Sequence, residues 1–271
     1  MSGLGRKLQA FLRRDLLTTS SYRFALLLQA FQVGSGLWMY FFLSRTMGGT
    51  ITPALEPYGS SFFAFVLVGV AFWGLFSNAL IGAMNTIRGE QRSGTMEALL
   101  TMPIPAWLVV LGGAVQPLVL SVLELVLYLA GGALFFDVDW SRASWPAVMT
   151  LLGLSLGHGA VLGLFIAALI VVVKRGDQMV WVLASGLALM TGIFYPVEVL
   201  PAPLRALATL LPLTQALQGL RRALFRGASL GDLWPEISIV GLSTLGLAVL
   251  GTWVLNRALD YARVEGSLGQ F

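Results

Sequence analysis

Residues 60–86 read SSFFAFVLVGVAFWGLFSNALIGAMNT, a stretch of 27 residues without a charged side chain. About 20 apolar residues in an α-helix are enough to cross the ~30 Å hydrocarbon core of a bilayer. A transmembrane β-strand needs only about 9–11 residues and alternates polar with apolar side chains. This stretch is long and does not alternate, so it predicts a transmembrane helix.

The composition of the whole chain agrees with this segment. Of the 271 residues, 57% are hydrophobic and 11% are charged, and the mean hydropathy is +0.82. Soluble domains usually contain about 25% charged residues. Because backbone polar groups inside a bilayer must find partners within the protein, helices are favoured. We therefore expect residues 1–271 to form a single all-α integral membrane domain.

Six membrane-spanning helices are predicted, separated by segments that contain charges, proline or glycine. They cover about 24–43, 60–86, 107–136, 147–173, 179–195 and 237–255. Before them, residues 1–22 place Leu and Phe opposite Arg and Lys at helical spacing, which predicts an amphipathic interfacial helix. A removed targeting peptide and a solvated arm are the alternatives for this segment. Residues 197–226 are interrupted by prolines and predict two short helices that enter the outer interface without crossing.

The cationic side chains predict the orientation. With six spans and both termini in the cytoplasm, 11 of the 17 Lys and Arg residues lie inside and six lie outside, as the positive-inside rule requires. The outer cluster of Arg221, Arg222 and Arg226 fits this rule least well. A basic excess of this origin reports topology and not nucleic-acid binding. The expected location is a prokaryotic inner or plasma membrane, as a multi-pass protein surrounded by lipid.

Several kinds of chemistry are excluded by the residue supply. The chain has no cysteine and one histidine, so disulfides, thiol catalysis and a metal site are not expected. Neither Lys7 nor Lys174 lies in a G-x-x-x-x-G-K-[ST] phosphate-binding loop. The chain itself is therefore not expected to be an enzyme or to bind a cofactor, and any ATP hydrolysis belongs to a separate subunit.

The cytoplasmic segment 88–102 is longer than a turn between two spans requires. It is predicted to form a short amphipathic helix, with Thr95 as N-cap, Glu97 in the first turn and Pro103 at its end. Its apolar face holds Met96, Leu99 and Leu100, and its charged side chains are Glu90, Arg92 and Glu97. Such an ordered segment suggests a docking element for a cytoplasmic partner.

Two stretches, in this order between these spans, resemble the type 2 permeases of ATP-binding-cassette exporters. The first is Glu90-x-x-x-Gly94-Thr95-Met96-Glu97-x-Leu99-Leu100-x-x-Pro103, which is similar to the coupling helix that fits a cleft on the ATPase. The second runs from Thr191-Gly192-Ile193-Phe194-Tyr195-Pro196 through Leu200-Pro201 to Pro212, and is similar to the re-entrant outer helices before the last span. This chain departs from the common pattern with Met96 in place of Leu and Ser93 where a cation is frequent.

The resemblance implies a mechanism and a set of partners. Two permease chains, identical or related, would pair around a translocation path, with two ATPase subunits beneath them that bind ATP and magnesium. The implied contacts to the ATPase are Glu90, Arg92, Gly94, Thr95, Met96, Glu97, Leu99 and Leu100. The implied outer gate is Phe194, Tyr195, Pro196, Leu200, Pro201 and Pro212. The expected cargo is a small hydrophobic or amphipathic compound, a lipid or a polysaccharide.

Two ionisable residues inside the predicted spans are candidates for the substrate path. A carboxylate such as Glu124 costs about 2.5 kcal/mol or more in the bilayer unless it faces protein or water. It is predicted either to contact substrate or to form an interhelical hydrogen bond. His158 lies between Gly157 and Gly159 and either senses protons or makes a satisfied packing contact. An ion-gradient-driven transporter and an intramembrane hydrolase are the alternative functions, but neither the internal repeat nor the catalytic constellation that they need is evident.

Overall fold

A computed structural model of the chain describes residues 23–46, 61–94, 105–173 and 176–265. The helices are α2 (Arg23–Thr46), α3 (Phe62–Arg92), α5 (Ala106–Phe136), α6 (Trp145–Val172), α7 (Gly176–Thr191), the 3-10 helix η2 (Val197–Val199), α8 (Ala202–Leu210), α9 (Pro212–Arg226) and α10 (Trp234–Glu265). No β-strand occurs in these residues. The amphipathic helix predicted over residues 1–22 lies outside the described residues.

Five of the helices, α2, α3, α5, α6 and α10, are long and apolar enough to cross a membrane. This confirms the prediction of an all-α membrane protein. The predicted fifth span corresponds to α7, which begins three residues earlier than expected, at Gly176, and ends four residues earlier, at Thr191. At 1.5 Å per residue its 16 residues extend about 24 Å. The chain therefore combines five long apolar helices with one short one.

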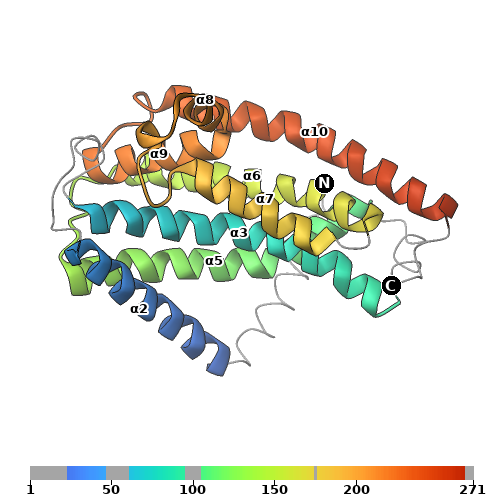
Figure 1. Ribbon diagram of the computed structural model, residues 1–271, viewed down its shortest axis with the longest axis horizontal. Coiled ribbons are helices and arrows are strands. Elements are labelled where there is room, and N and C mark those ends of the chain that lie inside the picture. Colours follow the sequence, from blue (N-terminus) through green and yellow to red (C-terminus); the bar gives the residue numbers. More distant parts are fainter. Residues whose placement is uncertain (1–22, 47–60, 95–104, 174–175, 266–271) are drawn as a thin grey trace.

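Helix α3 is the centre of the bundle. It packs against both α5 and α6, and α10 lies along α6 (Figure 1). The contact between α3 and α6 is close because small residues face each other: a Cβ on Gly163 would lie 2.8 Å from the Cβ of Ala83. Gly159 similarly faces Ala79. Small residues allow this approach in a membrane, where helices associate by close packing.

Helix α5 contains a proline in its interior. Pro117 lacks a backbone N–H, so the helix loses one internal hydrogen bond at this point. The proline ring lies against α3 at Gly82, where a Cβ would be 2.8 Å from Cγ of Pro117. One turn later the hydroxyl of Ser121 donates to the carbonyls of Pro117 and Leu118. The absence of a side chain at Gly82 thus makes room for Pro117.

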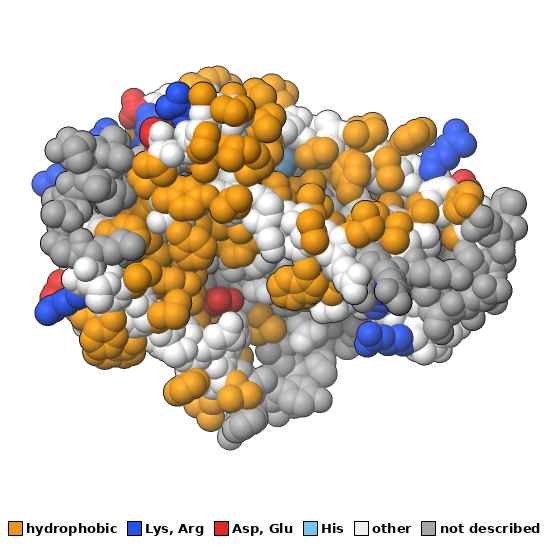
Figure 2. Space-filling view, in the orientation of Figure 1, with side chains coloured by type: hydrophobic (Ala, Val, Ile, Leu, Met, Phe, Trp, Pro, Cys, Tyr) orange, Lys and Arg blue, Asp and Glu red, His pale blue; other side chains and the backbone are white. Residues whose placement is uncertain are grey.

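The two ends of the bundle differ. Helices α8 and α9 lie at the end where α3 begins, while α3 and α6 finish at the opposite end (Figure 1). Hydrophobic side chains cover much of the middle of the visible face, and Lys and Arg gather towards the two ends (Figure 2). Cations that flank an apolar middle are expected of helices that span a bilayer.

Candidate functional site

The end of α3 forms the first part of the predicted ATPase contact. The helix continues through Arg92, so residues 88–92 belong to α3. The sequence had instead predicted that they begin a separate helix over 88–102. It ends where the N–H and hydroxyl of Ser93 both donate to the carbonyl of Gly89. Gly94 follows with φ of +67°, a conformation that glycine adopts readily. The glycine of the predicted motif therefore ends a helix.

The predicted coupling residues divide between described and undescribed parts of the chain. Glu90 is half-buried, whereas Arg92 and Gly94 are exposed at the end of α3. The remaining members, Thr95, Met96, Glu97, Leu99 and Leu100, lie outside the described residues. The structure thus places the start of this segment at the end of the bundle opposite α8 and α9 (Figure 1).

The corner after α7 forms part of the predicted outer gate. Gly192 has φ of +76° and turns the chain after the last helical residue. The hydroxyl of Tyr195 donates back to the carbonyl of Leu189. Phe194 is 44% exposed, and its ring centre lies 6.2 Å from that of Tyr40 in α2. The corner therefore directs one aromatic ring towards α2.

The remaining predicted gate residues mark the boundaries of the next elements. Pro196 is the N-cap of η2 and Leu200 its C-cap, Pro201 is the N-cap of α8, and Pro212 is the first residue of α9. Fixed φ angles and missing N–H groups suit prolines to such starts. The two short helices predicted in 197–226 are thus α8, which is almost wholly exposed, and α9, whose apolar face is buried.

Arg221 is the residue of this region whose role the sequence did not reveal. The charge count assigns it to an exposed outer segment, but in α9 it is only 2% exposed. Its Nη1 donates to the carbonyl of Gly192 at 2.9 Å, and its Nη2 donates to those of Phe65 and Ile193 at 3.0 Å each. The guanidinium also stacks 3.4 Å from the centre of the Phe65 ring. Arg221 therefore connects α9 to the corner after α7 and to α3.

A signal for this burial is present in the sequence. Leu217, Arg221 and Leu224 are spaced four and three residues apart, so they share one face of a helix. Both leucines are buried. Arg222 falls on a different face and is half-exposed. The period of α9 therefore distinguishes the two adjacent arginines, which a count of charges treats alike.

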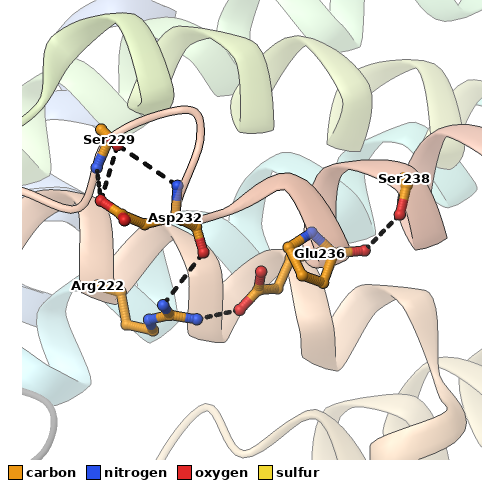
Figure 3. A network of polar contacts seen from close by, with 6 residues as sticks. Arg222, Ser229, Asp232, Glu236 and Ser238 are labelled. Atoms are coloured by element: carbon orange, nitrogen blue, oxygen red, sulfur yellow. Dashed lines mark hydrogen bonds and ion pairs between the residues drawn. The ribbon is translucent and has the colours of Figure 1, made fainter.

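A polar network connects α9 to the start of α10 (Figure 3). Arg222 forms an ion pair with Glu236, and its Nη2 donates to the carbonyl of Asp232 at 3.3 Å. Glu236 lies in the first turn of α10, where the helix dipole favours a carboxylate. The hydroxyl of Ser229 donates to Asp232 Oδ2 at 2.7 Å and its N–H donates to the same oxygen at 2.9 Å. These bonds hold the pKa of the Asp232 carboxyl below its ordinary value.

Glu124, the first substrate-path candidate, lies between α5 and α3. Nδ2 of Asn78 donates to Glu124 Oε2 at 3.4 Å, which supplies the interhelical hydrogen bond that was one of the two expectations. The carboxyl group is not closed off, because Glu124 is half-exposed. Gly74, one turn before Asn78, faces the same carboxylate: a Cβ there would lie 3.3 Å from Oε1. At 1.5 Å per residue, Glu124 is about 18 Å from the end of α5 at Phe136.

His158, the second candidate, is buried between α6 and α10. It is 3% exposed, and its Nδ1 lies 3.0 Å from Oγ1 of Thr244. The Thr244 hydroxyl donates to the carbonyl of Val240, so it accepts from a protonated Nδ1 of the histidine. This arrangement agrees with a satisfied packing contact. His158 and Glu124 thus have separate partners on separate pairs of helices.

Comparison with known proteins agrees with these features. The chain matches the family described as ABC-2 type transporter over residues 4–225. It is 26% identical over 154 residues to the probable multidrug ABC transporter permease YbhR of Escherichia coli strain K12, and equally to that of E. coli O157:H7. Each match covers 56% of this chain and 41% of the relative, so the aligned part is less than half of the relative's length. Because the family match covers most of the chain, this protein belongs to the ABC-2 type transporter family of membrane permeases.

Proposed function

We propose that this chain is the membrane-spanning subunit of an ATP-driven exporter. The observation that carries the proposal is the family match over residues 4–225, and the five long apolar helices are consistent with it. In this proposal the permease provides the translocation path, and separate ATPase subunits bind ATP and magnesium. The cargo is a small hydrophobic or amphipathic compound, in keeping with the word multidrug in the name of the similar permease.

The proposed assembly contains two permease chains, identical or related, and two ATPase subunits. The end of the bundle at which α3 and α6 finish faces the cytoplasm, with both termini on that side. This orientation is supported by the positive-inside count. The burial of Arg221 and the ion pair of Arg222 support it further. Exposed cations on the outer side would count against the positive-inside rule, whereas cations that are buried or paired within the protein count against it less.

The proposed contact with the ATPase is the segment that begins at the end of α3. Glu90, Arg92 and Gly94 start it, and Thr95, Met96, Glu97, Leu99 and Leu100 complete it. Because α3 packs against both α5 and α6, a displacement of its end would be transmitted to the centre of the bundle. The outer gate, at the opposite end, would be the corner at Phe194–Pro196 together with Leu200, Pro201 and Pro212.

The experiment that tests this proposal measures ATP turnover in lipid nanodiscs. The chain is purified together with a candidate partner ATPase subunit, and the wild type is compared with Glu97→Arg. We expect a stoichiometric complex in the wild type, and dissociation or uncoupled turnover in the variant. Glu198→Arg is the matched control, because Glu198 is exposed in η2, at the outer end.

Two results would contradict the proposal. One is a wild-type chain that binds no ATPase and transports on an ion gradient. The other is equal loss of coupling in Glu97→Arg and Glu198→Arg, which would mean that the position of the charge is irrelevant. No specific observation favours the ion-gradient alternative, since Glu124 and His158 hydrogen-bond to different residues, Asn78 and Thr244.

A further inference from the structure

Glu124 is an incompletely satisfied carboxylate in the middle part of the bundle. Its hydrogen bond within the described residues comes from Asn78, and at 3.4 Å it is long. No Lys or Arg of the described residues forms an ion pair with Glu124. Glu124 is partly exposed, so its side chain is not closed off from the surface of the bundle. Figure 2 shows acidic surface in the otherwise largely apolar middle of the visible face.

One tyrosine lies near this carboxylate, and a second lies near the first. Tyr128 lies one turn beyond Glu124 on α5, close enough to both Glu124 and Tyr40 to interact electrostatically with them. Its hydroxyl lies against α2 at Gly36, where a Cβ would be 2.8 Å from Oη. Tyr40 is one turn further along α2. Within the described part of the chain, neither hydroxyl has a hydrogen-bond partner. Tyr128 is only 5% exposed, whereas Tyr40 is half-buried and is the more accessible of the two to a ligand.

The surrounding helices approach the site closely and leave α2 exposed. Gly74 and Gly36 have no side chain, so α3 packs against Glu124 and α2 packs against Tyr128. Most of α2 is exposed, with Val33 and Leu37 as its buried hydrophobic residues. The ring of Tyr40 lies next to the ring of Phe194 in the predicted outer gate. Aromatic rings therefore extend from the carboxylate towards the outer corner.

The chemistry of these groups selects one kind of ligand. A carboxylate in a region of low dielectric constant attracts a cation more strongly than it would in water, and aromatic rings bind organic cations through their faces. A hard metal ion would need several oxygen ligands, and no cluster of three His, Cys, Asp or Glu occurs in the described residues. An apolar surround instead favours a ligand with a hydrophobic body.

We propose that Glu124, Asn78, Tyr128 and Tyr40 form a binding site for hydrophobic organic cations between α2, α3 and α5. The inference rests on the proposed transport function, because it assigns a chemical class to the cargo. The cation sits beside the Glu124 carboxylate, its apolar groups contact the ring of Tyr40, the buried Tyr128 forms the inner wall of the site, and Asn78 positions the carboxylate. Organic anions of the same size are rejected by the charge of Glu124.

The test is equilibrium binding of tetraphenylphosphonium to the full chain in lipid nanodiscs without the ATPase. We expect Glu124→Gln, which keeps the shape and removes the charge, to weaken binding at least ten-fold. Asp137→Asn, which removes a carboxylate charge at an exposed position just after α5, should leave the affinity unchanged. Tetraphenylborate, an anion of similar size and shape, should bind the wild type weakly and should not lose affinity in Glu124→Gln. Equal phosphonium affinity in the wild type and Glu124→Gln overturns the proposal.

A second measurement uses only the wild type, so it does not depend on the folding of a variant. A hydrophobic carbodiimide labels carboxyl groups inside membranes, and mass spectrometry quantifies labelling at Glu124. Tetraphenylphosphonium should protect Glu124 and tetraphenylborate should not; absence of protection, or equal protection by both, refutes the site. Neither assay contains an ATPase, so phosphonium binding can fail while coupled ATP turnover is retained, and the reverse.

Discussion

Arg221 and Phe65 contact each other in two ways, through the ring and through the backbone. The guanidinium carbon lies 3.4 Å from the centre of the Phe65 ring, and Nη2 donates to the Phe65 carbonyl at 3.0 Å. The same side chain donates to the carbonyls of Gly192 and Ile193. A single buried cation thus satisfies three backbone oxygens from two segments that are far apart in the sequence.

Replacement of Arg221 by methionine should destabilise the protein. Hydrogen bonds to a charged group are worth about 1.5–3 kcal/mol, and their loss leaves buried carbonyls without a donor. We expect the free energy of unfolding of Arg221→Met to fall by about 2–4 kcal/mol. Denaturant unfolding in detergent measures this change. Arg205→Met, at an exposed position of α8, is the control and should change stability by less than about 0.5 kcal/mol. An equal loss of stability in the two variants would show that the buried hydrogen bonds of Arg221 contribute no more than an exposed arginine does.

Gly69 should not tolerate alanine. A Cβ at this position would lie 2.6 Å from Nη2 of Arg221 and closer still to the carbonyl oxygen of Ile193. Because the carbonyl is backbone, it cannot move aside as a flexible side chain would, and overpacking of this kind costs about 1–3 kcal/mol. Gly34→Ala is the matched control, since nothing lies within 4 Å of its Cβ position. The melting temperature should fall in Gly69→Ala only; a fall of the same size in both would refute the steric argument.

The Arg222–Glu236 ion pair should contribute measurably to the docking of α9 on α10. The Arg222 side chain is 37% exposed and that of Glu236 is 11% exposed, so solvent screens the pair in part. A double-mutant cycle with Arg222→Gln and Glu236→Gln should give a coupling energy of about 0.5–2 kcal/mol. The measured quantity is the free energy of unfolding of the four proteins. A coupling energy of zero would show that the two side chains act independently.

The turn between α9 and α10 should be sensitive to acid. Hydrogen bonds from Ser229 lower the pKa of Asp232 in the folded protein, so their stabilisation is present above the ordinary aspartate pKa of about 3.9 and is lost as the pH falls through the folded value. Ser229→Ala should therefore lower the melting temperature near neutral pH, and this difference should shrink at about pH 3. A difference that stays constant with pH would exclude the Asp232 carboxylate as its cause.

Gly94 should be required for the geometry of the segment after α3. Its φ of +67° is strained for other residues, although no atom lies within 4 Å of its Cβ position. Gly94→Ala should therefore cost about 1 kcal/mol through the backbone alone and should reduce the stimulation of ATP turnover by the permease. Gly89→Ala is the control, because Gly89 is helical and equally unobstructed. Alanine favours a helix there, so this variant should retain full stimulation, and a loss in both variants would contradict the role of Gly94.

The positions of the long helices could be predicted because the bilayer imposes a simple requirement. A segment such as 60–86 must be apolar over its whole length, and that property is visible in the sequence. The end of α3 was less visible, because residues 88–92 are polar but still favour a helix, so α3 continues to Arg92. The change from apolar to polar residues marks where the helix leaves the lipid. The end of the helix itself depends on the turn at Ser93 and Gly94.

Of the candidate site, only Glu124 was predicted from the sequence, and its neighbours were not. Glu124 stands out because a carboxylate is rare within a span, and its neighbour Asn78 is 46 residues away in the sequence. Such pairing depends on the packing of α3 on α5, which periodicity within one segment does not specify. The burial of Arg221 was not predicted because a count of charges treats it like Arg222, and only the helical period of residues 212–226 separates the two.

Pro117 divides α5 into two stretches of unequal length. The first, shorter stretch follows the segment that connects α3 to α5, and the second contains Glu124. A helix without one of its internal hydrogen bonds bends more easily at that place than elsewhere. Because Pro117 packs on the bare backbone of Gly82, α3 serves as the fulcrum for this bend. A displacement applied at the start of α5 would then change the tilt of the helical stretch that carries Glu124. The motion would vary the angle between the two stretches more than the depth of the carboxylate in the membrane.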